Sequence, residues 1–293
     1  MISVIIPTLN EFDNIEPLLG RILQCQPAPD EIVFVDDGST DGTRERIRSF
    51  IASAPVRLIE RNTPTFGLSG AVIAGARAAQ GDLLVVMDAD LSHPPEKMSE
   101  LVRPILEGTA DMVIGSRYVH GASTPGWPVW RKIMSRIAAG IAYPLTGVHD
   151  SMCGFFAMRR TALLELTPAA TGFKIAFEAI VHGGKQLRVV EIPIVFRDRA
   201  RGTSKMSLGV PLRFAFRWLA AASRMRFRRG SQLRPQGAAV SKPPSGARFG
   251  NRPSLPPSRP QLGNRRRVAK APTRSFHTPE FNRQTDEKQE GRA

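Results

Sequence analysis

Short apolar runs alternate with longer amphipathic segments through the first 120 residues, and this alternation constrains the fold more than any other feature. The runs of strand length lie at 3–6, 32–35, 56–59, 83–87 and 112–114. The segments of helix length lie at 11–24, 41–53, 68–79 and 95–107. Strands and helices that take turns in this way indicate an α/β fold with a mostly parallel, Rossmann-like sheet and helices on both faces. The less regular part that follows predicts a helix at 127–143, a strand at 154–158, a helix at 173–182 and an extended segment at 187–196.

Positive charge is concentrated at the C-terminal end of the chain. Residues 1–223 carry 24 basic and 22 acidic side chains, a balance of +2, whereas 224–293 carry 17 and 4, a balance of +13. A domain that binds nucleic acid through its folded face should itself carry the basic stripe, so this class is disfavoured. We expect a catalytic domain over 1–206, a basic amphipathic helix over 207–225 and a disordered Arg/Pro-rich tail over 226–293.

The helix expected at 207–225 has two interpretations. Arg213, Arg217 and Arg224 share one side, and leucine and alanine side chains share the other. The helix either packs on the domain or lies in a membrane interface. The tail is most simply a solvated segment, although its basic clusters could also attract anionic lipid or nucleic acid.

Cysteine content and the apolar runs bear on the compartment. The chain has 2 cysteines, Cys25 and Cys153, with no CxxC motif, so neither a disulfide framework nor a structural zinc site is expected. The N-terminus lacks the features of a secretory signal, and arginines interrupt the longest apolar stretches. We expect a reduced, cytoplasmic setting with at most peripheral membrane contact.

Acidic residues follow three of the expected strands. Glu11 comes after the first, Asp36 and Asp37 after the second, and Asp88 and Asp90 after the fourth. The carboxyl ends of parallel strands form the ligand-binding edge of an open α/β sheet. Carboxylates two residues apart at such an edge can bind a hard divalent cation together with a diphosphate, although a single carboxylate there is commonly a helix cap.

Six short stretches resemble one known family, the family 2 glycosyltransferases of the GT-A fold, and within it the dolichol-phosphate mannose synthases. The resemblance runs from residue 2 to about 210, and its final Arg-x-x-Gly-x-Ser-Lys element separates this subgroup from family 2 enzymes at large. The matching stretches are 6–11, 35–43, 87–96, 115–118, 150–155 and 196–205.

The resemblance implies a role for each matching position. Asp90 and Arg117 would be the catalytic residues, and Mg²⁺ or Mn²⁺ would be bound by Asp88, Asp90 and Ser92. The acceptor phosphate would meet Arg117, Arg131 and Lys205. Two departures bear on specificity, since Ser92 replaces a common Gln and Leu9 a common Tyr. The nucleotide sugar would be bound by Pro7, Glu11, Val35, Asp37, Asp88, Ala89, Asp90, Arg117, Arg199 and Lys205.

The same resemblance implies the reaction. A sugar, with mannose from GDP-mannose the first choice, would pass with inversion to a polyprenyl or dolichyl phosphate at the cytosolic face of a membrane. Attachment would be peripheral, directly or through a membrane partner subunit. A phosphate acceptor is already ionised and needs no general base, whereas a hydroxyl acceptor needs one. Asp150 is the spare candidate for that base, and a helix or turn cap is its simpler interpretation.

Two alternatives remain open. One is a family 2 enzyme that glycosylates a saccharide hydroxyl with another nucleotide sugar. Processive synthases of this type carry Gln-x-x-Arg-Trp, and here Phe214 stands in place of the Gln before Arg217 and Trp218. The other is a protein without catalytic activity that binds its partner through the basic tail.

Overall fold

The structure is a computed structural model that describes residues 1–62, 65–167 and 174–198. Arg199 and Lys205 lie outside the described residues. So do the helix predicted over 207–225 and the tail over 226–293. The domain boundary expected at residue 206 therefore stays a prediction.

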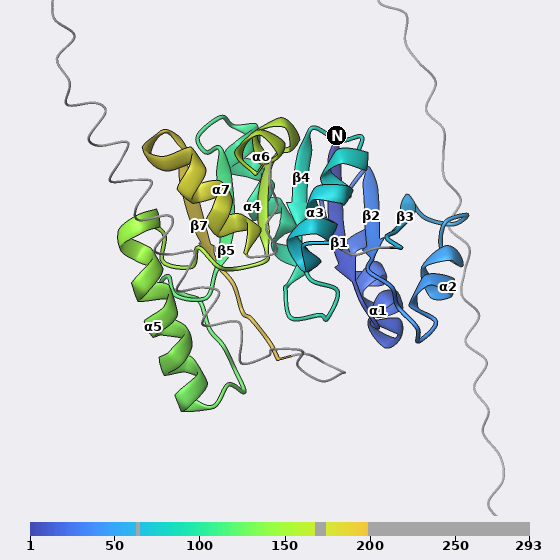
Figure 1. Ribbon diagram of the computed structural model, residues 1–293, viewed down its shortest axis with the longest axis horizontal. Coiled ribbons are helices and arrows are strands. Elements are labelled where there is room, and N and C mark those ends of the chain that lie inside the picture. Colours follow the sequence, from blue (N-terminus) through green and yellow to red (C-terminus); the bar gives the residue numbers. More distant parts are fainter. Residues whose placement is uncertain (63–64, 168–173, 199–293) are drawn as a thin grey trace, which may run out of the picture. The chain divides into compact units, whose positions relative to one another are not determined.

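The described part of the chain is built on a seven-stranded sheet with the order β3-β2-β1-β4-β6-β5-β7 (Figure 1). Neighbouring strands are parallel except where β6 pairs with β4 and β5, to both of which it is antiparallel. The α/β class and the mostly parallel sheet are confirmed. The strands are β1 (Ile2–Thr8), β2 (Glu31–Asp36), β3 (Val56–Glu60), β4 (Leu83–Val86), β5 (Met112–Ser116), β6 (Phe156–Arg159) and β7 (Val189–Pro193).

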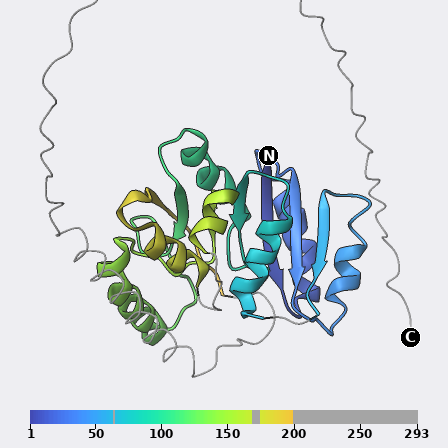
Figure 2. The ribbon, with the colours of Figure 1, turned by 45° about the horizontal axis from the view of Figure 1, so that its top comes forward.

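Helices cover both faces of the sheet (Figure 2). Helix α3 packs on β1 and β2, α4 packs on β4, β5 and β6, and α5 contacts α7. The short 3-10 helices are η1 (Pro95–Lys97) and η2 (Gly184–Gln186). The α-helices are α1 (Phe12–Leu23), α2 (Thr43–Arg48), α3 (Gly67–Ala78), α4 (Met98–Leu106), α5 (Val129–Thr146), α6 (Arg160–Leu166) and α7 (Ile175–Gly183).

Most expected elements are present with shifted ends. The helix expected over 41–53 is confined to α2, which ends at Arg48 and continues as turns. Helix α6 was not predicted, because it starts directly at the end of β6 and is only 7 residues long. The extended segment at 187–196 contains β7. Among the strands that the structure describes, β7 pairs with β5 alone, so Pro193 ends an edge strand, as its missing N–H requires.

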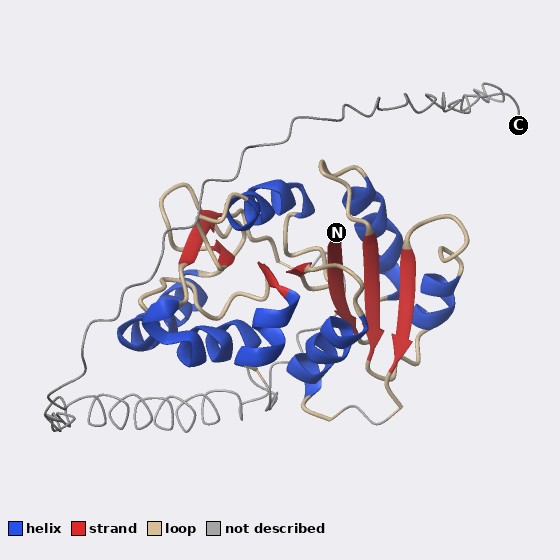
Figure 3. Cartoon of the chain, turned by 90° about the horizontal axis from the view of Figure 1, so that it is seen from above, coloured by secondary structure: helices blue, strands red, loops and turns tan. Residues whose placement is uncertain are grey.

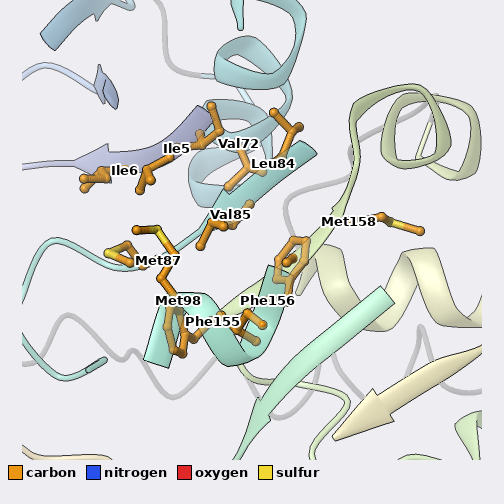
Figure 4. Packing of buried hydrophobic residues seen from close by; sticks show 14 of the residues in the cluster. Ile5, Ile6, Val72, Leu84, Val85, Met87, Met98, Phe155, Phe156 and Met158 are labelled. Atoms are coloured by element: carbon orange, nitrogen blue, oxygen red, sulfur yellow. The ribbon is translucent and has the colours of Figure 1, made fainter. Parts of the chain in front are cut away.

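The core lies between the sheet and its helices. Strands β1 and β2 are buried along their whole length, as expected for strands covered on both faces. Ile5, Val72 and Leu84 meet where α3 packs near β1 and β4, and Phe155 and Phe156 fill the region beside Met98 (Figure 4). Gly75 permits the close approach of α3, because a Cβ there would lie 2.5 Å from Cγ2 of Ile5.

The strand directions bring several chain segments to one edge of the sheet. Strands β1, β2 and β3 lie side by side and point the same way (Figure 3). Strand β4 is parallel to β1, and β5 also follows this direction, since both β4 and β5 are antiparallel to β6. The residues after these five strands therefore share the carboxyl edge, where ligands of α/β sheets bind.

Candidate active site

Asp36 organises the loop after β2. Its carboxylate is fully buried and accepts hydrogen bonds from the backbone N–H groups of Gly38 (3.1 Å) and Ser39 (2.9 Å), and from the side chains of Ser39 and Arg44. Burial disfavours ionisation, but the hydrogen bonds from Ser39, Arg44 and the backbone outweigh it and lower the pKa of Asp36 below its ordinary value. Asp36 thus stabilises the loop after β2 through hydrogen bonds within the protein.

Asp37 points to a different partner. Its Oδ1 accepts a hydrogen bond of 2.7 Å from Nη1 of Arg61, the first residue after β3. Burial raises the pKa of Asp37, and the guanidinium of Arg61 opposes this effect. Both side chains are largely buried, with exposed fractions of 11% for Asp37 and 12% for Arg61.

The loop after β4 carries the expected metal ligands. Asp88 is partly exposed, whereas Asp90 and Ser92 are buried, and Oδ1 of Asp90 accepts a hydrogen bond of 3.1 Å from the backbone N–H of Ser92. Leu91 between them has a φ of 62°, a left-handed conformation that is rare for leucine. This turn brings the residues on either side of Leu91 back toward each other.

His93 fixes the same loop from inside. Its Nδ1 accepts a hydrogen bond of 3.1 Å from the backbone N–H of Asp88, so the proton of the neutral ring is on Nε2, which lies 3.9 Å from Sγ of Cys153. The ring stacks on Phe155, with a centroid distance of 5.3 Å. Burial lowers the pKa of His93. His93 therefore packs inside the loop that carries Asp88.

The residues of this loop fit a divalent cation. The Oγ of Ser92 is buried and has no hydrogen-bond partner among the described residues. Gly154 leaves space for Asp88, since a Cβ there would lie 3.2 Å from Oδ1 and 3.3 Å from Oδ2 of Asp88. Within the described ranges, no group of three or more His, Cys, Asp or Glu side chains forms a metal cluster. Two carboxylates and a hydroxyl suit a cation that completes its oxygen shell with diphosphate and water.

Arg117, directly after β5, is bound by Asp150. Nε and Nη2 of Arg117 each lie 2.8 Å from a different oxygen of Asp150, and the backbone N–H of Arg117 donates to Asp150 Oδ2 at 2.9 Å. The guanidinium also lies near the rings of Tyr118 (5.3 Å), Trp127 (5.7 Å) and Phe196 (5.3 Å). Although burial opposes its charge, the hydrogen bonds and charge of Asp150 raise the pKa of Arg117. The interpretation of Asp150 as a cap is wrong, because its carboxylate is fully buried against this guanidinium.

Glu191 of β7 supports Asp150 in turn. Its Oε1 accepts a hydrogen bond of 2.9 Å from the backbone N–H of Asp150, and its Oε2 accepts one of 2.9 Å from the backbone N–H of His149. The segment that carries Asp150 is therefore fixed to the edge strand of the sheet.

Two cavities open at this edge. The first is lined by Pro7 of β1, Ser69 of α3, Asp88, Gly154 and Lys174. The second is lined by the hydroxyl residues Ser123 and Thr124 and by three cations, Arg117, Lys132 and Arg136. Asp88 and Arg117 thus face separate cavities. The buried His93 lies near both side chains, and the charges of both act on its pKa.

Residues 3–167 match the model of the family described as "Glycosyl transferase family 2", more than half of the chain. The chain belongs to glycosyl transferase family 2. It is also 45% identical over 212 residues to a dolichol-phosphate mannosyltransferase of Pyrococcus furiosus, covering 70% of this chain but only 59% of the relative. An undecaprenyl-phosphate mannosyltransferase of Micrococcus luteus is 39% identical over 222 residues, which cover 71% of this chain and 88% of that protein.

Among solved structures, this family 2 glycosyltransferase resembles glucosyl-3-phosphoglycerate synthase from Mycobacterium tuberculosis. The TM-score is 0.52 at 25% identity, and the match covers 70% of this chain and 72% of the other. That structure contains Mn²⁺, UDP-glucose and phosphoglyceric acid. The GT-A fold predicted from the sequence is confirmed.

The expected site residues of this family 2 glycosyltransferase occupy different surroundings. Pro7 and Asp88 share the first cavity. Glu11 binds Asn14 through its carboxylate at 2.7 Å, and Val35 and Ala89 are buried in the core. The nucleotide-binding roles of these residues remain predictions.

Arg131 is not among the residues that line the second cavity, although it contacts Trp127, which is. Its Nη1 lies 2.6 Å from Asp198, and its guanidinium lies 4.1 Å from the centre of the Trp127 ring. Its role in binding the acceptor phosphate also remains a prediction.

Sequence reasoning missed several polar residues at the site of this family 2 glycosyltransferase. Arg61 follows β3 directly, as Asp37 follows β2, so its place at a strand end was a usable signal. Lys132 and Arg136 lie one turn apart on α5. The sequence pattern predicted a helix here but did not indicate which side of the helix faces the site. Lys174 precedes α7 and carried no motif.

Proposed function

We propose that this chain transfers a mannosyl group from GDP-mannose to the phosphate of a polyprenyl lipid, with inversion at the anomeric carbon. The reaction depends on Mg²⁺ or Mn²⁺ and takes place at the cytosolic face of a membrane. The relatives named for dolichol-phosphate and undecaprenyl-phosphate mannosyl transfer support both the sugar and the class of acceptor.

The loop Asp88–Ser92 is the observation on which the proposal rests. It presents two carboxylates and a buried hydroxyl that has no hydrogen-bond partner in the described part of the chain, beside the space that Gly154 leaves for Asp88. Asp88, Asp90 and Ser92 would bind the cation, which when bound neutralises the charge that develops on the departing diphosphate. Pro7 and Ser69 line the same cavity as Asp88, which supports a nucleotide sugar as its occupant.

The transfer is a single displacement. A phosphate oxygen of the lipid attacks the anomeric carbon, a carbon–oxygen bond forms, and the bond from that carbon to the diphosphate breaks. The nucleoside diphosphate leaves with the electron pair. Arg117 keeps a fixed orientation through Asp150, and its Nη1 donates no hydrogen bond to any residue that the structure describes, so it is available to a phosphate. Lys132 and Arg136 add positive charge to the cavity that Arg117 lines.

The acceptor in this scheme needs no general base, and the site agrees with that requirement. Asp150 is fully buried and is committed to Arg117. His93 is also buried, and its Nδ1 already accepts the hydrogen bond from Asp88. Asp150 is the side chain that the sequence offered as a base, and a lipid phosphate would need neither Asp150 nor His93 in that role.

Helix α5 supports contact with a membrane surface. Six apolar side chains on α5 are 47–71% exposed: Val129, Trp130, Ile133, Met134, Ile137 and Ile141. At 100° per residue they span an arc of about 140°, with Lys132 and Arg136 on one side and Arg131 on the other. An apolar arc flanked by cations is typical of a helix that lies in the interface of an anionic bilayer. Among the described helices, none is both long and apolar enough to cross a membrane.

A transfer assay tests the proposal. The full chain is incubated with radiolabelled GDP-mannose, MnCl₂ or MgCl₂, and undecaprenyl phosphate in detergent, and the label is extracted into organic solvent. We expect metal-dependent label in the lipid fraction that mild acid releases as mannose. Label that stays in the water phase with every common nucleotide sugar would refute lipid phosphate as the acceptor.

A further inference from the structure

Arg57 of β3 and Arg61, the first residue after β3, bind the two ends of α3. Arg57, near the start of the strand, forms an ion pair with Glu31 and donates a hydrogen bond of 2.9 Å to the carbonyl of Ala78, the last residue of α3. Arg61, just after the strand, contacts the other end of the helix, at Gly67. Only the Arg61 end belongs to the carboxyl edge of the sheet.

Arg61 connects three chain segments. Its Nη1 donates to Asp37 Oδ1 at 2.7 Å and to the carbonyl of Gly67 at 3.3 Å, and its Nη2 donates to the carbonyl of Thr65. Its backbone N–H also donates to the carbonyl of Asp36 at 2.9 Å. The guanidinium is therefore shared by the loop after β2 and the segment that enters α3.

The packing around Arg61 leaves little freedom. A Cβ on Gly70 would lie 2.8 Å from Nη2 of Arg61 and would also overlap the carbonyl of Thr65, so the first turn of α3 closes directly over the guanidinium. Phe66, immediately before the helix, has a φ of 64°, which directs the chain into α3. Leu68 and Ser69, in the same turn, line the cavity that contains Asp88.

We propose that Arg61 is a positioning residue for nucleotide binding, which fixes the carboxylate of Asp37 to the entry of α3. The inference rests on the proposed function in one respect, namely that Asp37 binds the nucleoside part of the donor. Arg61 itself is covered by its protein partners and acts through Asp37, whose Oδ2 accepts no hydrogen bond from the described residues.

Two charged groups act on Asp37, namely Arg61 and the neighbouring Asp36. Burial raises the pKa of Asp37, Arg61 lowers it, and the negative charge of Asp36 raises it. Without Arg61, the carboxylate would be left with the two effects that favour protonation. A neutral Asp37 would be a weaker acceptor for a ribose hydroxyl or a base N–H.

Calorimetric titration of the full chain with GDP, and separately with UDP, in the presence of MnCl₂ tests the inference. For the nucleotide that wild type binds, we expect Arg61→Met to raise Kd about tenfold and Arg57→Met to change it less than about twofold. Adding Arg61→Met to Asp37→Asn should raise Kd by less than a further factor of about three, because the two substitutions remove the same interaction. As the pH is lowered, Arg61→Met should begin to lose nucleotide affinity at a higher pH than Arg57→Met does.

Arg57→Met is the matched control. Arg57 lies four residues before Arg61 and, like Arg61, binds both a carboxylate and a backbone carbonyl of α3. Equal Kd values for the two variants would overturn the inference. So would a double variant of Arg61→Met and Asp37→Asn whose increase in Kd is the product of the two single increases. If Arg61→Met does not fold, Arg61→Lys is titrated, with an expected rise of about threefold in Kd. Nucleotide binding without mannosyl transfer would refute the proposed function alone, whereas absence of binding to both nucleotides would refute the inference as well.

Discussion

The guanidinium of Arg117 and the carboxylate of Asp150 form a bidentate ion pair between positions 33 residues apart in the sequence, and both nitrogen–oxygen distances are 2.8 Å. Asp150 is fully buried, and the Arg117 side chain is 13% exposed. We expect Asp150→Ala to lower the free energy of unfolding by about 3–5 kcal/mol, because it leaves a buried charge without its partner. Urea denaturation measures this loss. A change below about 1 kcal/mol, the usual value for an exposed pair, would contradict the buried pairing.

Asp90→Ala should lower mannosyl transfer about a hundredfold or more while the protein remains folded, because the substitution removes a carboxylate from the expected metal site. Initial rates are measured against MnCl₂ concentration, and circular dichroism reports the fold. Asp82→Ala, at an exposed position, is the control and should keep the wild-type rate. Wild-type rates for Asp90→Ala would argue against Asp90 as a metal ligand.

Gly154→Ala should raise the MnCl₂ concentration needed for half-maximal transfer. The new methyl group would lie 3.2–3.3 Å from both carboxylate oxygens of Asp88, so that side chain must move. Gly20→Ala provides the comparison, because no atom lies within 4 Å of its Cβ position on α1. It should leave the metal requirement unchanged and stabilise the protein by about 0.5–1 kcal/mol. The same metal requirement in both variants would count against the close contact with Asp88.

Acid should destabilise the protein partly through Asp36. Its pKa in the folded state is below the ordinary value of 3.8, so its contribution is present above that value and is lost as the pH falls through the folded-state pKa. Arg44→Ala removes one of the hydrogen bonds that lower this pKa. The free energy of unfolding of Arg44→Ala should therefore change less than that of wild type between about pH 5 and pH 2. Parallel pH curves for the two proteins would show that Arg44 does not stabilise the charge of Asp36.

The double substitution of Ile133→Asn and Ile137→Asn should weaken binding to vesicles about tenfold, since it removes apolar area from the exposed arc of α5. Co-sedimentation is measured with phosphatidylcholine vesicles that contain about 30% phosphatidylglycerol. Leu106→Asn alters an apolar side chain that is 60% exposed on α4 and should have little effect. Equal binding of the double variant and wild type would remove α5 from the membrane contact.

The sequence predicted the sheet well and the partners of its long side chains poorly. Strands such as β1 and β2 were recognisable because their apolar runs end at turn residues, and the alternation with helices set their common direction. The carboxylates at 88 and 90 could be singled out as candidate ligands because their spacing and their place after β4 are local features. Arg61 was missed and Asp150 was misjudged, because each has a partner far along the chain and no local period specifies which cation a buried carboxylate will meet.

Strand β6 is the one member of the sheet that opposes its neighbours on both sides. The chain leaves the carboxyl edge after Ser116 and comes back to it at Phe156, so everything in between, α5 included, is a detour that starts and finishes at one place. The first part of this detour, from Arg117 to Arg136, lines the second cavity, whereas its last part, with Cys153 and Gly154, lines the cavity that contains Asp88. A change in the first part can therefore reshape the second cavity while the cavity with Asp88 keeps its lining.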